Sequence, residues 1–139
     1  MGTVIRAEVS NKNKYWIEKH RYYELKHFCL QYPIWKKSYA VLDGFNQRPL
    51  DLYSTFSKGS VSDPVARCVE AKLFYSERMD MLKQAAIDTA PDLSDYILKG
   101  VTEGISYDYL KSRLDIPCCK DVYYDLYRRF FWLLSRARE

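Results

Sequence analysis

The chain has 139 residues, of which 47% are hydrophobic and 16% aromatic, and its formal net charge at pH 7 is +4. This length suffices for one well-filled core, so a division into independent domains is not expected. Only 5 Gly and 5 Pro are present, and no sustained alternation of apolar and polar residues occurs, which argues against a β-sandwich or barrel. The sequence therefore predicts an all-α protein, folded as one compact helical domain.

The sequence shows no sign of secretion or membrane insertion. It has no apolar signal-peptide region and no segment long enough to span a bilayer, so we expect a cytoplasmic protein. The four cysteines are then expected as thiols, and their spacing does not match a zinc site. Cys118 and Cys119 precede a predicted helix start, where a thiolate would be stabilised, so redox sensing is an alternative role for them.

The charges are unevenly distributed along the chain. Residues 1–42 carry a net charge of +5, residues 43–103 carry −3, and residues 104–139 carry +2. A basic beginning and a basic end thus flank an acidic middle, which suits an anionic partner that contacts both ends.

Residues 1–12 have no clear period and are predicted to form a flexible lead-in. Residues 13–91 are predicted to be a helical packing and partner region, with helices at 13–31 and 34–42. The first of these helices has apolar stripes on two opposite faces, which predicts packing between two neighbours. Asp43-Gly44 is a turn signal, and residues 43–62 are predicted to form a long loop.

Asp63-Pro64 predicts the start of a helix that ends near Thr89. One side of this helix carries residues at alternating steps of three and four, with a single charged interruption: Val65, Cys68, Lys72, Tyr75, Met79, Leu82 and Ala86. The pattern fits packing within a bundle, and it also fits a coiled-coil seam with a second subunit.

Residues 92–139 are predicted to form a helix-turn-helix region. A helix over 93–100 is broken by Gly104, because Gly tolerates the left-handed geometry that ends helices. Ser106 is a ready N-cap for a second short helix, which stops before Pro117. The final helix is predicted to begin near Cys118 and to run to the C-terminus.

Two faces are predicted on this final helix. Val122, Leu126, Phe130, Leu133 and Ala137 share an apolar face, and Lys120, Asp121, Tyr124, Asp125 and Arg128 lie opposite. The second set can reach base edges and phosphates, as in a recognition helix, or it can simply be a solvated face. The predicted DNA-binding residues are Ser106, Tyr107, Lys111, Lys120, Asp121, Tyr124 and Arg128.

The second half of the final helix is apolar all round, since residues 130–134 read Phe-Phe-Trp-Leu-Leu. Either the N-terminal part of the chain or a second subunit must cover Phe131 and Trp132. We predict a homodimer or partner interface formed by Trp16, Tyr23, Phe131 and Trp132.

No catalytic motif is present: the chain lacks a Gly-x-Ser-x-Gly elbow, a His-Glu-x-x-His pair and a dinucleotide fingerprint. His20 and His27 are seven residues apart, too far for a pair of metal ligands on adjacent turns. We therefore expect no enzyme activity, no catalytic residue, no metal site and no cofactor.

The segments 14–37, 105–111 and 116–134 resemble small proteins of Gram-positive phages and prophages. The C-terminal part also resembles the region 4 helix-turn-helix of sigma factors and of phage late-gene activators of the RinA and ArpU kind. The resemblance implies binding to promoter DNA, with Lys120, Asp121, Tyr124 and Arg128 on the recognition face. It also implies transcription regulation in a host bacterial cell, with RNA polymerase or another host protein as a partner.

Asp121 and Asp125 depart from a strongly basic recognition helix. The resemblance to phage proteins admits a second role, a small protein that binds and inhibits a host protein such as a CRISPR nuclease. A terminase-like DNA packaging subunit is a third alternative.

Overall fold

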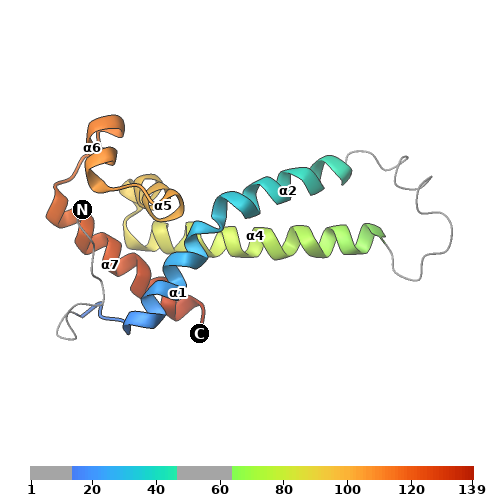
Figure 1. The fold of residues 1–139 in the computed structure, drawn as a ribbon, viewed down its shortest axis with the longest axis horizontal. Coiled ribbons are helices and arrows are strands. Elements are labelled where there is room, and N and C mark those ends of the chain that lie inside the picture. The colour runs from blue at the N-terminus through green and yellow to red at the C-terminus, as the bar shows by residue number, and fades with distance from the viewer. Residues whose placement is uncertain (1–13, 47–63) are drawn as a thin grey trace. The chain divides into compact units, whose positions relative to one another are not determined.

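The structure is a computed structural model, and it describes residues 14–46 and 64–139. Its elements in chain order are α1 (Lys19–Leu30), α2 (Tyr32–Asn46), α4 (Pro64–Thr89), the short 3-10 helix η1 (Pro91–Leu93), α5 (Ser94–Glu103), α6 (Tyr107–Leu114) and α7 (Lys120–Ala137) (Figure 1). The described residues contain no strand, so the predicted all-α class is confirmed. None of their helices is long and apolar enough to cross a membrane. The lead-in predicted for residues 1–12 lies outside the described residues, as does most of the predicted loop.

Contacts within the chain group these elements into two units, where the sequence predicted a single compact one. The first unit combines α1 with the last part of α4, from Met81 onward, and with all the elements that follow. The second unit consists of α2 and the earlier part of α4, up to Asp80. Nearly all the buried side chains among the described residues belong to the first unit.

The helix ends around α6 follow the predicted local signals. Gly104 ends α5 in the left-handed region at φ 67°, and the Ser106 hydroxyl caps α6 by accepting a hydrogen bond from the backbone N–H of Tyr109. Asp115 also adopts a left-handed conformation, at φ 54°, and terminates α6 before Pro117. α7 begins at Lys120, with Cys119 as its N-cap residue, two residues after the predicted start.

Two predicted boundaries in the N-terminal part are wrong. α1 begins at Lys19 because Glu18 caps it, with a side-chain oxygen that accepts from the backbone N–H groups of His20 and Arg21. The preceding residues are not helical: Tyr15 and Ile17 are buried while Trp16 between them is exposed, a period of two. α2 continues through the predicted Asp43-Gly44 turn to Asn46.

The core of the first unit lies where α1, α5 and α7 meet, and these helices contact one another pairwise. The largest fully buried side chains come from all three helices and from their neighbours: Leu25, Cys29, Leu82, Ile97, Leu110, Ile116, Tyr123, Phe130, Phe131 and Leu134. Tyr22 of α1 meets Phe131 of α7 edge-on at a centroid distance of 5.3 Å. At the end of α7, the Arg21 guanidinium donates to the hydroxyl and to the carbonyl oxygen of Ser135, at 3.1 and 2.9 Å.

The inner face of α7 differs from the predicted one. Val122, placed inward by the sequence analysis, is 46% exposed, whereas Tyr123 next to it is 1% exposed. The buried face consists of Tyr123, Phe130, Phe131 and Leu134, with Tyr127 adjoining. The prediction assigned Tyr123 to neither side, but Tyr123 is among the most fully buried side chains of α7.

Gly100 of α5 is required by the position of Tyr123. A Cβ atom at residue 100 would collide with the Tyr123 hydroxyl oxygen, so the two helices can approach this closely only with glycine here. The hydroxyl itself is buried and has no hydrogen-bond partner among the described residues, and burial raises the pKa of Tyr123. Close packing and an unsatisfied hydroxyl therefore occur at the same point.

We expect Gly100→Ala to lower the free energy of unfolding by about 1–3 kcal/mol, because it overpacks this contact. In a Tyr123→Phe background the clash is absent, and the same change should instead raise stability by up to about 1 kcal/mol through helix propensity. Urea denaturation of the four chains measures this reversal of sign. An equal loss of stability in both backgrounds would contradict the assigned contact.

The second unit is held by polar contacts along the seam between α2 and α4. The Lys72 ammonium lies 2.8 Å from the Asp43 carboxylate and 5.2 Å from the centre of the Tyr39 ring. The Cys68 thiol donates to the Leu42 carbonyl oxygen at 3.7 Å. Of the described apolar residues in this unit, only Trp35 and Met79 are buried. Lys72, the charged interruption of the predicted seam, is thus an internal ion-pair partner.

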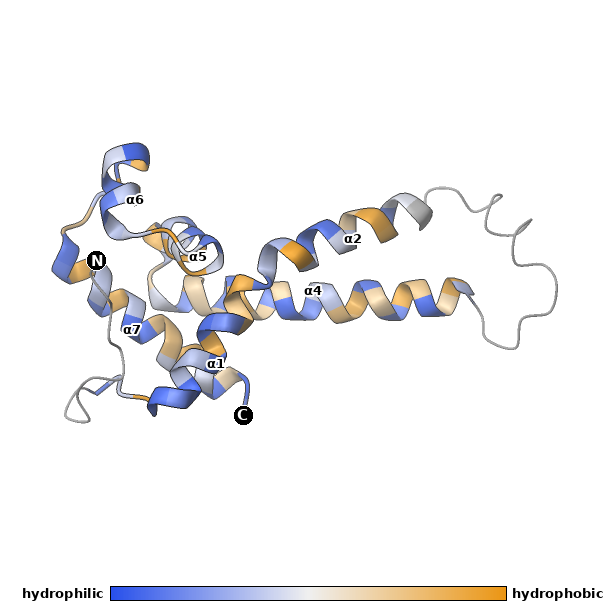
Figure 2. Ribbon diagram, in the orientation of Figure 1, coloured by the Kyte–Doolittle hydropathy of each residue, from blue (hydrophilic) through white to orange (hydrophobic). Residues whose placement is uncertain are grey.

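Apolar side chains also lie on the outside of the second unit, and Figure 2 shows apolar positions along both α2 and α4. Six large apolar residues there are more than 40% exposed: Ile34, Val41, Val65, Val69, Leu73 and Phe74. An exposed apolar surface of this extent is typical of a protein interface.

The hydrogen bond to Asp43 raises the pKa of Lys72, an effect that exceeds the opposing effect of burial. Because the pKa of Lys72 is raised in the folded state, the ion pair stabilises the fold at neutral pH. This stabilisation is lost as the pH rises through the folded-state pKa and the ammonium loses its proton. We expect Asp43→Asn to speed amide hydrogen exchange in α2 and in the first part of α4, but not in α5–α7. Asp80→Asn, which removes an exposed carboxylate of the same unit, is the control and should change neither.

Candidate nucleic-acid interface

The turn between α6 and α7 is fixed by side chains from α6. The Tyr107 hydroxyl donates to the Cys118 carbonyl oxygen at 2.6 Å, and the Lys111 ammonium donates to the Ile116 carbonyl oxygen at 3.2 Å. Ile116 is completely buried, and its N–H donates to the Leu110 carbonyl oxygen at 3.3 Å. The direction in which α7 leaves the turn is therefore set by contacts at both ends of the loop.

Three of the predicted DNA-binding residues serve this local structure. The Ser106 hydroxyl is engaged as the cap of α6, although Ser106 itself is exposed. Lys111 holds the turn and also lies 3.8 Å from the Asp115 carboxylate. Tyr107 is only 8% exposed, so its prediction as a DNA contact is corrected: the ring lies in the core, and its hydroxyl holds Cys118.

The other four predicted residues lie together on the solvent side of α7. Lys120 and Asp121 are exposed, and Tyr124 and Arg128 are partly exposed. The Lys120 ammonium lies 5.9 Å from the centre of the Tyr124 ring, and an Arg128 Nη donates to the Tyr124 carbonyl oxygen at 3.4 Å. Steps of four residues place Lys120, Tyr124 and Arg128 in one row along the helix. We call these three residues the α7 row.

The environment of Tyr124 is partly apolar. Its ring contacts Tyr107 and Tyr127 at centroid distances of 6.3 and 6.4 Å, and partial burial is the main cause that raises its pKa. The phenol therefore stays neutral at physiological pH and can both donate and accept hydrogen bonds.

The charge around the α7 row is balanced. Residues 107–128 contain four basic and four acidic side chains, namely Lys111, Arg113, Lys120 and Arg128 against Asp108, Asp115, Asp121 and Asp125. Asp121 and Asp125 are both exposed beside the row. The surface is therefore not a basic footprint that would bind any polyanion by charge alone.

The predicted partner residues fall into two groups. Trp16 and Tyr23 are 40% and 38% exposed, as an interface requires. Phe131 is completely buried against Tyr22, Tyr127 and Phe130 of its own chain, so its prediction as an interface residue is corrected. The N-terminal part of the chain covers the Phe131 ring, because Tyr22 of α1 packs against it.

Trp132 is half-buried, and its neighbours include residues that the sequence did not single out. Its ring lies 5.7 Å from the Tyr15 ring, and the Arg136 guanidinium lies 4.8 Å from its centre. Arg129 donates to the Tyr15 hydroxyl at 3.3 Å. The four-residue step from Trp132 to Arg136 was visible in the sequence, but the approach of Tyr15 depends on the extended segment before α1.

The cysteines offer little chemistry. Burial is the main cause that raises the pKa of the Cys118 thiol, which argues against the stabilised thiolate considered for it. Cys29 is completely buried, and burial raises its pKa as well. No group of metal-ligating side chains is found within residues 14–46 and 64–139.

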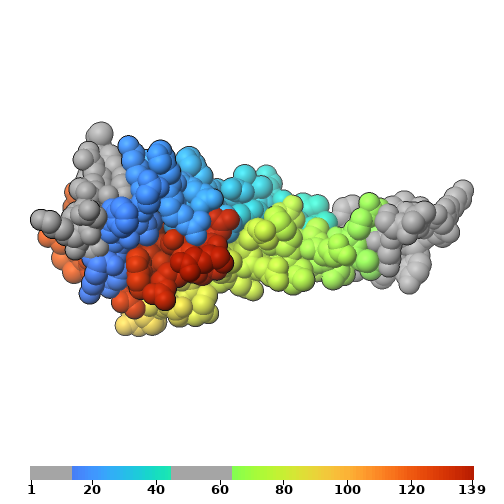
Figure 3. Space-filling model, turned by 90° about the horizontal axis from the view of Figure 1, so that it is seen from below, coloured from blue at the N-terminus to red at the C-terminus, as the bar shows by residue number. Residues whose placement is uncertain are grey.

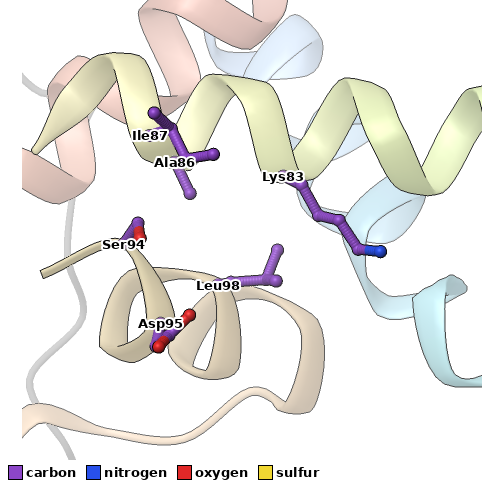
Figure 4. Close-up of a pocket in the computed structure, with 6 residues that line it drawn as sticks. All are labelled: Lys83, Ala86, Ile87, Ser94, Asp95 and Leu98. Atoms are coloured by element: carbon purple, nitrogen blue, oxygen red, sulfur yellow. The ribbon is translucent and has the colours of Figure 1, made fainter. Parts of the chain in front are cut away.

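A shallow pocket of about 180 Å³ lies between the end of α4 and the start of α5 (Figure 4). Its walls are mainly Ala86, Ile87 and Leu98, while Lys83, Ser94 and Asp95 line its edge. It has room for an apolar side chain of a partner.

We expect Tyr107→Phe to cost about 1 kcal/mol of unfolding free energy, because the Cys118 carbonyl oxygen loses its buried donor. It should also increase hydrogen exchange in the turn that leads into α7. Tyr109→Phe removes the same group from a 49% exposed ring on the same helix and should be neutral. Thermal denaturation of both variants tests this difference, and equal melting temperatures would show that the 2.6 Å hydrogen bond does not hold the turn.

No protein-family model, no curated protein and no solved structure matches this chain. What this surface can bind therefore follows from the positions, burial and charges of its own residues.

Proposed function

We propose that this chain is a transcriptional regulator of the phage type that binds duplex DNA through α6 and the N-terminal half of α7. The observation that carries the proposal is the α7 row: one basic, one aromatic and one basic side chain face solvent on a helix whose entry turn is fixed. Lysine and arginine at such positions contact phosphates and guanine, and a tyrosine hydroxyl can contact either a base or a phosphate.

The first turn of α7 adds donors to the same surface. Cys119 makes no side-chain capping hydrogen bond, so backbone N–H groups at the helix start are not occupied by a cap. Such groups, together with the positive end of the helix dipole, favour a phosphate oxygen. We therefore expect the start of α7 and Lys120 to contact phosphates of the DNA backbone.

The balanced charge suggests how such a surface would discriminate among sequences. Asp121 and Asp125 repel phosphates, and a carboxylate in the major groove accepts a hydrogen bond from the amino group of cytosine. We therefore expect modest affinity for arbitrary DNA and a stronger dependence on base sequence than a purely basic helix would give.

Two copies would allow the chain to contact two half-sites one helical turn apart, as other helix-turn-helix proteins do. Trp16 and Tyr23 remain exposed for a second copy, for RNA polymerase or for another host protein. In this proposal α7 contacts the DNA, and Tyr23 of α1 together with Trp16 in the segment before it contacts a protein.

The test is fluorescence anisotropy with a labelled duplex at several salt concentrations. Lys120→Gln and Arg128→Gln should each weaken binding about tenfold and reduce the slope of log K against log salt by about 1. Lys99→Gln, which removes one charge from α5, is the matched control and should have little effect. Absence of duplex binding at low salt would overturn the proposal.

A second candidate function is supported by a different observation. The exposed apolar residues on α2 and α4 would suit a protein that binds and inhibits a host protein. In that case Val69→Glu and Leu73→Glu should abolish a host-protein complex that survives Lys120→Gln, as measured by co-purification from host cells. If DNA binding fails with Lys120→Gln and no host complex depends on Val69 or Leu73, this alternative is excluded.

A further inference from the structure

We propose that a basic–aromatic cluster formed by Lys14, Tyr15, Arg129, Trp132 and Arg136 binds the phosphodiester backbone of duplex DNA, as a second contact beside the α7 row. This inference rests on the proposed function and deepens it. The cluster joins the extended segment before α1 to the C-terminal half of α7, because Tyr15 contacts Trp132 and Arg129. In Figure 3 the blue N-terminal part of the chain lies beside the red C-terminal part.

The geometry of the cluster is continuous. The Lys14 ammonium lies 5.0 Å from the centre of the Tyr15 ring, and the Tyr15 ring lies 5.7 Å from that of Trp132. The Arg136 guanidinium follows at 4.8 Å from the centre of the Trp132 ring. Arg129 fixes the centre of the cluster, because its two terminal nitrogens donate to the Tyr15 hydroxyl and to the Asp88 carbonyl oxygen, each at 3.3 Å.

The cations of the cluster are not neutralised within the described part of the chain. The ion pairs found there involve Arg21, Lys72, Lys99 and Lys111, and none involves Lys14, Arg129 or Arg136. Arg129 donates only to neutral oxygens, and its Nε is buried without a partner. Three positive charges therefore converge on one aromatic pair, and two of them, on Lys14 and Arg136, belong to exposed residues.

The pKa of Tyr15 is consistent with a positive electrostatic potential at the cluster. Its pKa is lowered, first by the hydrogen bond from Arg129 and further by the charges of Lys14 and Arg129, despite the opposing effect of burial. A site that stabilises a phenolate also stabilises the anionic oxygens of a ligand. Asp88 accepts from Arg129 through its backbone carbonyl oxygen, and its carboxylate accepts from Gln84 at 2.9 Å.

The arrangement favours a phosphate over a stacked base. Arg136 already lies over the Trp132 ring, and Lys14 lies over the Tyr15 ring, so each ring has a cation on it. The rings hold the two cations in place by cation–π attraction, and the outward N–H groups remain available to a phosphate.

The position along α7 favours duplex DNA as the source of that phosphate. Lys120 and Arg136 are separated by about 24 Å along the helix axis, at 1.5 Å per residue. The major groove is about 12 Å wide. A helix that enters the groove at its N-terminal end therefore brings Arg136 outside the groove, level with the flanking backbone. Trp132 and Arg136 follow Arg128 at steps of four residues, and each step turns about 40° around the helix axis.

The experiment uses the full chain and fluorescence anisotropy with a labelled 20-base-pair duplex from low to physiological salt. The double variant Lys14→Gln/Arg136→Gln removes two exposed cations and spares the buried contacts of Arg129. It should reduce the slope of log K against log salt by about 2 and weaken binding at moderate salt at least tenfold. A double control, Lys83→Gln/Lys99→Gln, loses the same net charge from α4 and α5 and should retain most of the affinity. Circular dichroism should show unchanged helix content for both.

The possible outcomes separate this inference from the function on which it rests. If the cluster variant binds like the control while Lys120→Gln and Arg128→Gln still weaken binding, the cluster is not a DNA contact and the proposed function stands. If wild-type protein does not bind the duplex at all, the proposed function itself fails. If a single strand of the same length competes more strongly than the duplex and this advantage is lost in the cluster variant, the ligand is single-stranded and the assignment to duplex DNA is wrong.

Discussion

The packing of the aromatic inner face of α7 against α1 and α5 is the interaction on which the first unit depends. Tyr123, Phe130 and Phe131 place three large rings among the most fully buried side chains of the described residues. Because this face is engaged in the core, the exposed residues of α7, which include Lys120, Asp121 and Arg136, lie on its other sides. One helix thus supplies both core side chains and the candidate binding surface. A substitution on the inner face that rotated α7 about its axis would therefore also turn the α7 row.

Local signals with a direct physical cause were readable from the sequence. Gly104, Ser106 and Pro64 mark helix ends because each has a backbone geometry or a capping group that helices use, and helix boundaries lie at or next to each of them. The all-α class followed from the same reasoning. The Asp43-Gly44 signal failed, because helix formation continued and Asp43 found an ionic partner in α4.

The faces of the helices were harder to predict, because tyrosine has no fixed side. Assigning Tyr124 outward was compatible with the structure, but Tyr123 and Tyr107 are buried, and Val122 takes the exposed position that a hydropathy pattern gives to a polar residue. The α7 row could be predicted from the sequence, because Lys120, Tyr124 and Arg128 recur at helical spacing. The role of Tyr107 in fixing the turn and the gathering of Lys14 with Arg136 depend on tertiary contacts between distant segments, which no local pattern encodes.

The Lys72–Asp43 ion pair has a consequence for the alignment of α2 with α4. An apolar seam tolerates sliding by a helical turn, because one methyl group replaces another at little cost, but a charge in the seam has only one favourable counterpart. Sliding would leave the ammonium against the aromatic and aliphatic groups around it. In the second unit, where few of the described side chains are buried, this ion pair thus contributes to specifying the register of α2 against α4.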